Sequence, residues 1–465
     1  MREQQDTIAA VATAMAPAGI GIIRISGNEA VHIVDRLFTD ARGEHVLASA
    51  PGGFFRYGHI SDPRGQRLDE VMAAVFRAPH SYTGEDVVEL QCHGGLLLLT
   101  RVLEAVLSAG ARCAGPGEFT KRAFLNGRID LTQAEAVMDV IAAQNEAALQ
   151  NAGRQLGGVL RDRIRTLRED LLHESAFIEA ALDDPESYEE ELAGYNERLV
   201  AVVREISDAI ESMISGAEDG IRLRNGVRCA IIGRPNAGKS SLLNLLTGTE
   251  RSIVTPLPGT TRDTVEESVN IAGITLHLID TAGIRGNGTD APDAVELLGI
   301  GRARQALAEA ELVLFVADTA VPVTEEDRQL YRDAAGKPCI VIANKTDLTD
   351  AQLSPEDFPG ARIVRLSART GEGLEELKEA VSTLLLHADP LQADEIVIAS
   401  ARHKALLQEA QEALSHLTET IAAGLSEDFY TVDLMNAYAS LGTIIGEEVG
   451  DDLIDAVFSQ FCMGK

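Results

Sequence analysis

A glycine-rich segment from Gly233 to Ser240 has the residue spacing of a phosphate-binding loop. It follows the apolar run 229–232 and precedes a helical pattern, which is the context that such a loop requires. The glycines let successive backbone N–H groups converge on phosphates, and the N-terminus of the following helix adds its positive dipole end. Lys239 would contact the β- and γ-phosphates, and Ser240 would bind Mg²⁺. The sequence thus predicts a nucleoside triphosphate site that contains Asn236, Ala237, Gly238, Lys239, Ser240 and Ser241.

Two further blocks indicate which base is bound. The block Asn344, Lys345, Thr346 and Asp347 follows an apolar run, and a carboxylate in this position can accept hydrogen bonds from both N1–H and the N2 amino group of guanine. Adenine offers the wrong pattern of donors. The block Ser367, Ala368 and Arg369 follows the next apolar run and is expected to contact guanine through its backbone. The predicted substrate is therefore GTP.

A carboxylate and a threonine complete the predicted magnesium site. Asp280 ends an apolar run about forty residues after the loop, where an acid that orders the Mg²⁺ shell belongs, and the N–H of Gly283 would sense the γ-phosphate. Thr261 would supply a second hydroxyl to Mg²⁺ once the γ-phosphate orders its segment. We include in the predicted GTP site Thr255, Pro256, Leu257, Pro258, Gly259, Thr260, Thr261, Asp280, Thr281, Ala282 and Gly283.

The residue after this motif is Ile284, where Ras-like enzymes place the glutamine that positions the attacking water. An apolar side chain cannot do this, so hydrolysis must use another group. The side-chain oxygen of Asn236 could hold a monovalent cation against the phosphates, in the place of an arginine finger. An ordinary role as a loop residue is an equally good interpretation of Asn236 from the residues alone.

The elements that position these residues form an α/β pattern over residues 226–387. Strands are predicted at 227–232, 274–279, 312–317, 339–343 and 362–366, alternating with helices as in a doubly wound domain. Residues 1–119 instead mix β-like runs at 21–25, 71–76 and 87–91 with a helix over 97–107, which predicts an α+β domain.

Helical periodicity dominates the remaining segments, 120–225 and 388–465. Thr132 and Glu135 have the spacing of a capping box, and a turn is expected near residues 183–186. The stripe Leu407, Ala410, Leu414, Leu417 and Ile421 requires a packing partner. We predict one discontinuous all-α domain built from both segments, into which the α/β P-loop domain (Ras-like G domain) of residues 226–387 is inserted.

Composition indicates a globular protein with 45% hydrophobic and 24% charged residues. No long apolar run or signal-peptide pattern is present, so the sequence predicts a cytosolic protein without a membrane partner. The five cysteines are scattered, which argues against disulfides or a zinc site. The net charge is −31, of which −20 falls in the two helical segments. A polyanionic partner would need a local basic patch such as Lys121, Arg122 and Arg128, whereas the plainer interpretation is a solvated acidic surface.

Blocks along the whole chain resemble the MnmE (TrmE) family of tRNA-modification GTPases. Besides the GTPase motifs, the blocks that carry the resemblance are residues 6–10, 21–27, 82–86, 89–95, 116–119, 122–126, 131–136 and 461–465. The resemblance implies that GTP hydrolysis, with the flavoprotein partner MnmG in a heterotetramer or larger complex, adds an aminomethyl-type group to C5 of the tRNA wobble uridine. The carbon would come from a tetrahydrofolate in its 5-formyl or 5,10-methylene form.

The resemblance also implies site residues. The folate site would lie in the N-terminal domain of a homodimer and use Arg24, Glu89, Arg128 and Lys465. K⁺ would replace an arginine finger, with Asn236, Thr255, Leu257 and Thr260 as ligands, and would stimulate turnover. Glu296 would be the catalytic carboxylate that orients the attacking water through a bridging water. Cys462 matches the ending of the family and has a possible covalent role, although free cysteines are usually inert.

Two other functions are compatible with a GTPase. A ribosome-assembly switch would gate RNA binding through its flanking domains, but it should have a basic RNA-binding domain, and these flanks are acidic. A membrane-remodelling scaffold should have a basic amphipathic helix or a lipid anchor, and neither pattern is visible in the sequence.

Overall fold

The computed structural model describes residues 6–249, 267–279, 306–349, 351–386, 397–462 and 464. By their contacts the residues form two compact units. Unit 1 contains Met1–Met138 and Gly442–Lys465, and unit 2 contains Asp139–Leu441. Within the described ranges, no helix is both long and apolar enough to cross a membrane.

Unit 1 is built on a seven-stranded sheet in the order β3-β4-β5-β6-β2-β1-β7, which is antiparallel except for the parallel pair β1 and β7. Residues of helix α2 such as Leu99 and Val102 pack into the apolar core beneath one face of this sheet, together with Ile23 and Ile25 of β2. The strands are β1 (Ile8–Val11), β2 (Ala18–Ser26), β3 (Phe38–Asp40), β4 (Phe54–Ser61), β5 (Arg67–Phe76), β6 (Val87–Gly94) and β7 (Arg112–Cys113), and the helices are α1 (Ala30–Asp35) and α2 (Leu96–Ser108).

Residues from the last part of the sequence pack against residues 118–142 in a second apolar cluster of unit 1. Helices α3 (Glu118–Leu125), α4 (Leu131–Ala142) and α17 (Asp451–Phe458) surround an apolar cluster that includes Leu131, Phe458 and Phe461. Gly117 has φ of +64°, and a Cβ there would lie 2.6 Å from the carbonyl oxygen of Phe458. Glycine is therefore required where the later segment crosses the earlier one.

The predicted capping box at Thr132 and Glu135 is wrong by two residues. The carboxylate of Asp130 accepts hydrogen bonds from the N–H groups of Thr132 (2.7 Å) and Gln133 (3.1 Å), and the N–H of Asp130 donates to the side chain of Gln133 at 3.1 Å. Asp130 thus caps α4, because an Asp-x-x-Gln sequence satisfies the same N–H groups as the box that we expected.

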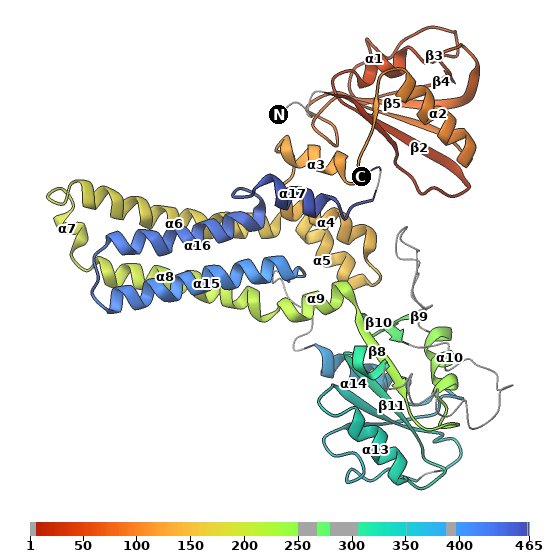
Figure 1. Ribbon diagram of the computed structural model, residues 1–465, viewed down its shortest axis with the longest axis vertical. Coiled ribbons are helices and arrows are strands. Elements are labelled where there is room, and N and C mark those ends of the chain that lie inside the picture. Colours follow the sequence, from red (N-terminus) through yellow and green to blue (C-terminus); the bar gives the residue numbers. More distant parts are fainter. Residues whose placement is uncertain are drawn as a thin grey trace. The chain divides into compact units, whose positions relative to one another are not determined.

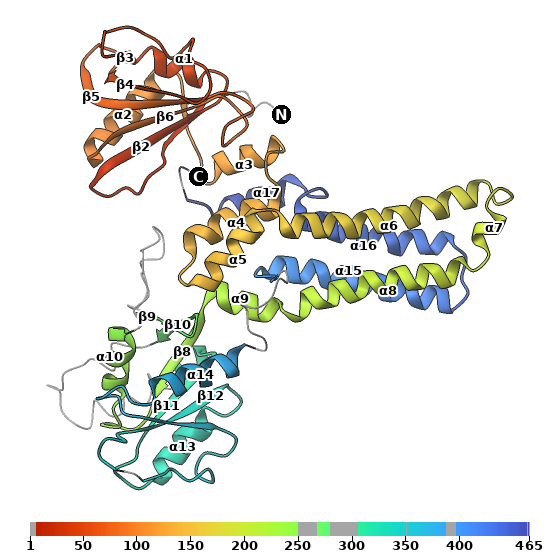
Figure 2. The same ribbon diagram turned by 180° about the vertical axis from the view of Figure 1, so that it is seen from behind.

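One part of unit 2 consists of helices. Figures 1 and 2 both draw α6, α8, α15 and α16 side by side as a bundle. The predicted stripe on α15 packs against α8, and its residues Leu407, Ala410, Leu414 and Leu417 are buried. The chain turns after Asp183, as predicted. The helices are α5 (Glu146–Leu156), α6 (Val159–Asp183), α7 (Glu189–Leu192), α8 (Tyr195–Ser215), α9 (Ala217–Asn225), α15 (Ala401–Ala422) and α16 (Asp428–Ile445).

A six-stranded sheet in the order β13-β12-β11-β8-β10-β9 forms the α/β part of unit 2. All neighbours are parallel except β9 and β10. Alternate residues of β8 enter separate apolar clusters, Cys229 with α10 and α14, and Ala230 beside α13, so both faces are covered. The elements are β8 (Val227–Ile232), α10 (Lys239–Thr249), β9 (Glu267–Ile271), β10 (Ile274–Ile279), β11 (Leu312–Asp318), α13 (Glu325–Asp333), β12 (Cys339–Asn344), β13 (Arg362–Leu366) and α14 (Leu374–Leu385).

This architecture confirms the predicted fold class of an α+β part, an all-α part and a P-loop α/β part. The division into units 1 and 2 follows contacts and does not separate the α/β part from the helices, so the three domain boundaries, after residues 119, 225 and 387, stay predictions.

Candidate functional site

The segment from Gly233 to Gly238 leaves the carboxyl end of β8 and enters α10 at Lys239. Gly233 has φ of +146°, and a Cβ there would lie 2.2 Å from the carbonyl oxygen of Val316. Gly238 has φ of +104°, and its Cβ would lie 2.1 Å from Nδ2 of Asn344. Only glycine fits at both positions, so the backbone can curl as a phosphate loop does.

Asn236 also has positive φ, +63°, and its side chain is exposed. Asparagine is one of the few residues with a side chain that tolerates this left-handed conformation. The loop geometry therefore explains an asparagine here without any cation, while it leaves the amide oxygen accessible at the loop where K⁺ was predicted.

Lys239 folds back onto the loop. Its Nζ donates to the carbonyl oxygens of Gly233 (2.7 Å) and Arg234 (2.8 Å). Burial lowers the pKa of this ammonium group. The arrangement holds one positive charge at the mouth of the loop, where phosphate oxygens can accept hydrogen bonds from it.

Asn344, at the end of β12, connects the phosphate loop to the segment 367–369. Its Nδ2 donates to the carbonyl oxygen of Ala237 at 2.8 Å, and its Oδ1 accepts from the N–H of Ala368 at 3.0 Å. The Asn344 carbonyl oxygen accepts from the hydroxyl of Thr319 at 2.8 Å. A single buried side chain thus fixes the phosphate loop relative to the segment that was predicted to contact guanine.

Ion pairs and a hydrogen bond position the residues that follow Asn344, which we call the base-recognition loop (345–347). Lys345 has φ of +68° and its Nζ lies 2.6 Å from Oδ2 of Asp318, at the end of β11. The carboxylate of Asp347 accepts a hydrogen bond from the buried hydroxyl of Ser367 at 2.8 Å, and Arg369 lies 3.7 Å from its other oxygen. Ser367 therefore orients the carboxylate that would read the base.

The structure brings together the predicted triphosphate residues that it describes. The loop 236–241, the block 344–347 and the block 367–369 lie at the carboxyl ends of β8, β12 and β13 in one sheet, where β11 separates β8 from β12. The remaining predicted residues lie outside the described residues: Thr255, Pro256, Leu257, Pro258, Gly259, Thr260, Thr261, Asp280, Thr281, Ala282, Gly283, Ile284 and Glu296.

Sequence reasoning missed Asp318 and Thr319, which support the base-recognition loop. A polar pair at the end of a buried strand, on the sheet edge where the loops gather, is a signal that could have found them.

A second group of candidate residues lies on the sheet of unit 1. Arg24 and Glu89 face each other on β2 and β6, with Nε of Arg24 2.8 Å from Oε1 of Glu89. The guanidinium groups of Arg24 and Arg128 lie 5.1 Å and 5.2 Å from the centre of the Tyr82 ring. Three of the four predicted folate residues thus gather around Tyr82, which sequence reasoning had quoted only as part of a family motif.

The fourth predicted folate residue, Lys465, lies outside the described residues. Its neighbour Gly464 is placed, and the carbonyl oxygen of Gly464 accepts a hydrogen bond from Arg24 at 3.4 Å. The half-buried Cys462 accepts, through its backbone carbonyl, from the N–H of Gly117 at 3.4 Å. A covalent role for Cys462 stays a prediction.

The basic patch proposed for a polyanion is not available as expected. Arg122 is only 4% exposed and lies 2.7 Å from Asp6, 3.1 Å from Glu118 and 3.2 Å from Glu85. Lys121 pairs with Asp455 at 2.5 Å. Asp6, Glu85 and Asp455 come from distant parts of the sequence and Glu118 is four residues away, so of the three patch residues only Arg128 is exposed.

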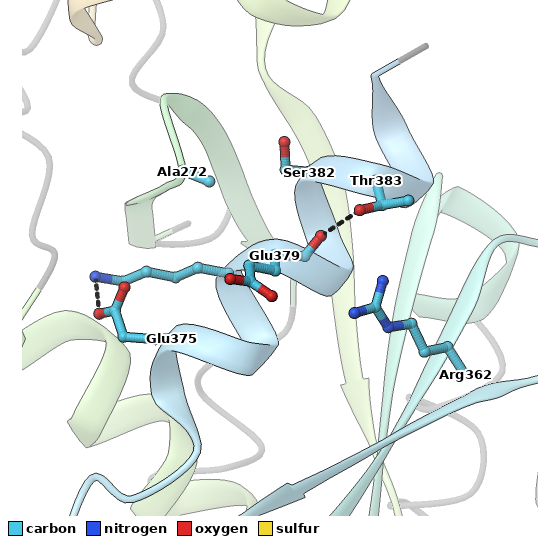
Figure 3. A pocket seen from close by; sticks show the side chains of 7 residues that line it. Ala272, Arg362, Glu375, Glu379, Ser382 and Thr383 are labelled. Carbon is cyan, nitrogen blue, oxygen red and sulfur yellow. Dashed lines mark hydrogen bonds and ion pairs between the residues drawn. The ribbon is translucent and has the colours of Figure 1, made fainter. Parts of the chain in front are cut away.

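A hollow of about 460 Å³ lies beside α14, away from the phosphate loop (Figure 3). Its charged side chains are Arg362, Lys378, Glu375 and Glu379, and Lys378 pairs with Glu375 at 2.9 Å. Positive and negative groups balance, so this hollow lacks the excess positive charge that a triphosphate needs.

Two family models match the chain. Residues 7–128 match the model described as the GTP-binding protein TrmE N-terminus, and residues 131–462 match the MnmE helical domain. Together these models cover nearly all of the sequence.

Curated relatives match at full length. Proteins named tRNA modification GTPase MnmE are 44% identical in Lachnoclostridium phytofermentans, over 99% of each chain, and 46% identical in Chloroflexus aurantiacus, over 99% of this chain and 100% of the relative. Among solved structures, the G domain of the T. maritima FeoB iron transporter is 32% identical over 34% of this chain and 98% of its own, with a TM-score of 0.25. The family assignment rests on the models and the full-length relatives.

Proposed function

Because the chain belongs to the MnmE family of tRNA modification GTPases, we propose that it couples GTP hydrolysis to the addition of an aminomethyl or carboxymethylaminomethyl group at C5 of the tRNA wobble uridine. As a member of this family, the protein is a GTP hydrolase that acts in tRNA modification. The position of the modified atom and the chemistry of the added group belong to the proposal.

The observation that carries the proposed nucleotide chemistry is the connection made by Asn344. Its side chain bonds both to Ala237 of the phosphate loop and to Ala368 of the base-contacting segment. These loops are therefore held at a fixed separation, as is required to bind the phosphates and the guanine of one nucleotide together. Asp347, oriented by Ser367, would accept hydrogen bonds from guanine.

Magnesium and phosphate binding would use the loop itself. Lys239 would exchange its bonds to the loop carbonyls for bonds to phosphate oxygens, because an ammonium group gains more from an anion than from a neutral carbonyl. Ser240 lies at the start of α10, where its hydroxyl would bind Mg²⁺ with Thr261 and the shell ordered by Asp280. Bound Mg²⁺ would neutralise charge that develops on the phosphates.

Potassium would complete the GTPase site. Asn236, with its exposed amide in the phosphate loop, would bind K⁺ together with Thr255, Leu257 and Thr260, and K⁺ would supply the charge of an arginine finger.

Glu296 would orient the attacking water, since Ile284 stands where Ras-like enzymes have glutamine. Replacing Glu296 by alanine should lower kcat and leave the affinity for GTP unchanged, and a normal kcat would remove Glu296 from the proposal.

The group around Tyr82 fits a folate. An aromatic ring with two guanidinium groups near it offers a stacking surface and positive charge, and the paired Glu89 carboxylate can accept from ring N–H groups. We assign Arg24, Glu89, Arg128 and Lys465 to this site. A tetrahydrofolate in its 5-formyl or 5,10-methylene form would supply the one-carbon unit.

The proposed assembly is a homodimer that acts with the flavoprotein MnmG, in a heterotetramer or larger complex, on tRNA. Nucleoside analysis of tRNA from cells that lack this protein tests the proposal. Wobble uridines should lose the C5 substituent, native protein should restore it, and Asp347→Asn should fail to do so. A full set of modified uridines in the deleted strain would refute the proposed function.

A further inference from the structure

Helix α16 has an apolar face exposed to solvent. Phe429, Val432 and Met435 are 56%, 57% and 40% exposed, and Leu425 just before the helix is 48% exposed. Phe429, Val432 and Met435 follow one another at intervals of three positions on the helix, so they form a single stripe, which we call the α16 stripe.

The opposite side of α16 already contributes to the bundle core. Tyr430, Leu434, Ala437 and Leu441 are buried. A helix that is apolar on both sides is normally buried on both sides. The neighbouring helix α15 shows the ordinary pattern, because the exposed side chains on it include Gln408, Glu412 and Glu419.

The surroundings of the α16 stripe are acidic. Figures 1 and 2 both place the start of α16 at the same end of the bundle as α7 and the end of α6. Residues 169–192 of those elements contain ten acidic residues and no lysine or arginine, and no lysine or arginine occurs between residues 405 and 464. Glu427, Asp428 and Asp433 lie beside the stripe in sequence.

The acidic residues around the α16 stripe distinguish between three possible binding partners. A second copy of the same surface would bring two acidic surroundings together, which opposes association. A bilayer with anionic lipids would be repelled for the same reason. A helix with an apolar face and flanking lysines or arginines would instead gain both apolar burial and attraction to the acidic residues.

We propose that the α16 stripe is a docking surface for a basic amphipathic helix of another protein. Phe429 and Val432 would anchor the apolar side of that helix, and Met435 would adapt to it, since methionine packs against varied shapes. The acidic residues of α6, α7 and α16 would attract its basic flanks. This surface goes beyond the proposed function, because no step of nucleotide or folate chemistry involves it.

A synthetic peptide of about 18 residues, five helical turns long, tests the proposal on the full-length protein. Its leucines repeat at intervals of three and four, and its other positions are mainly lysine. Fluorescence anisotropy should show binding at least ~10-fold tighter than that of a version with glutamate in place of lysine, and of a scrambled version with the same composition.

The double variant Phe429→Ser/Val432→Ser should weaken peptide binding at least ~10-fold. Phe55→Ser removes an equally exposed aromatic residue from β4 of unit 1 and should leave binding unchanged. Both variants should hydrolyse GTP as the native protein does, so that failure of the docking proposal is distinguishable from failure of the GTPase assignment.

Three results would overturn the proposal. Equal binding of the helical and scrambled peptides, or no effect of the double variant, would mean that charge alone attracts the peptide. A change of oligomeric state in Phe429→Ser/Val432→Ser by sedimentation would assign the stripe to a second copy. Stripe-dependent binding to vesicles of phosphatidylcholine and phosphatidylglycerol would assign it to a membrane.

Discussion

Nδ2 of Asn344 donates a hydrogen bond to the carbonyl oxygen of Ala237 at 2.8 Å, so the residue that begins the base-recognition block also supports the phosphate loop. Asn344→Ala removes this bond and the one to Ala368, and it leaves a buried carbonyl and a buried N–H without partners. We expect the free energy of unfolding to fall by about 1–3 kcal/mol and the affinities for GTP and GDP to fall together. Urea denaturation and nucleotide titration measure these effects.

Asn244→Ala is the matched control for that experiment, because Asn244 is an exposed asparagine of α10. It should change neither stability nor affinity appreciably. If Asn344→Ala affected GTP binding while stability stayed native, Asn344 would act on the nucleotide directly and not through the loops.

Base selection should follow Asp347. Asp347→Asn replaces an acceptor by a donor, so that the preference should move from GTP toward xanthosine triphosphate, as competition binding would show. Ser367→Ala should weaken GTP binding without changing this preference, because it removes only the hydroxyl that orients the carboxylate. The control Asp357→Asn, at a carboxylate paired with Arg328, should bind GTP normally.

Potassium dependence can be separated from loop geometry at Asn236. The native enzyme should hydrolyse GTP at least ~10-fold faster in K⁺ than in Na⁺. Asn236→Gly retains the φ of +63° without strain but lacks the amide oxygen, so K⁺ and Na⁺ should then give similar rates. A variant that keeps the full potassium effect would exclude Asn236 as a ligand.

Folate binding should depend on both arginines near Tyr82. We expect Arg24→Gln and Arg128→Gln each to weaken binding of 5-formyltetrahydrofolate by at least ~10-fold in calorimetry, since each substitution removes a positive charge beside Tyr82. GTP hydrolysis should be unchanged. Arg56→Gln removes an exposed arginine of β4 and serves as the control, with native folate affinity expected.

The ion pairs of Arg122 predict how stability depends on pH. Hydrogen bonding from Arg112 is the main cause that lowers the pKa of Asp6, against the effect of burial. Burial alone would raise the pKa of Glu118, but hydrogen bonds from Arg112, Gly115 and Arg122 outweigh it and lower that pKa. Folding therefore gains stability from both carboxylates above their ordinary pKa values of 3.8 and 4.5, and it loses this stability as the pH falls below them.

Replacing Arg122 by methionine leaves the carboxylate of Glu85 without its cation, whereas Asp6 and Glu118 keep their ion pairs with Arg112. The free energy of unfolding at neutral pH should fall by about 3–5 kcal/mol. Mild acid should then restore part of it, because protonation removes the unpaired charge. Chemical denaturation at several pH values measures both effects, and a variant that only loses stability on acidification would contradict this account.

The strands of the α/β part were predictable because most of their side chains are apolar and buried. The bounds expected for β8, β10 and β13 coincide with the observed ones, since runs that are mainly apolar and β-branched mark these strands even where a polar residue such as Arg228 or His277 interrupts them. Strand β9 was missed because Glu267–Ile271 is short and carries polar residues at its start. The cap of α4 was misplaced since Asp130 and Thr132 are both good capping residues, and local sequence does not distinguish them.

Contacts between distant residues limited the prediction of the site. The pairs Asp318 with Lys345 and Arg122 with Glu85 join residues 27 and 37 positions apart, and they depend on the register of neighbouring strands and loops. The phosphate loop was predictable because its residues are adjacent in the sequence. The stacking of Arg24 and Arg128 near Tyr82 became visible only in the folded sheet.

The crossing of the two segments at Gly117 has a consequence for biosynthesis. Unit 1 needs Phe458 and Phe461, which the ribosome makes about 300 residues after Met138, a delay of roughly 15–60 s at ordinary rates of translation. The first sheet therefore leaves the ribosome before the helix that completes its unit exists, and until then the Phe124 side of α3 stays incompletely covered. Nascent chains of this protein should accordingly be chaperone clients until residues 442–464 emerge.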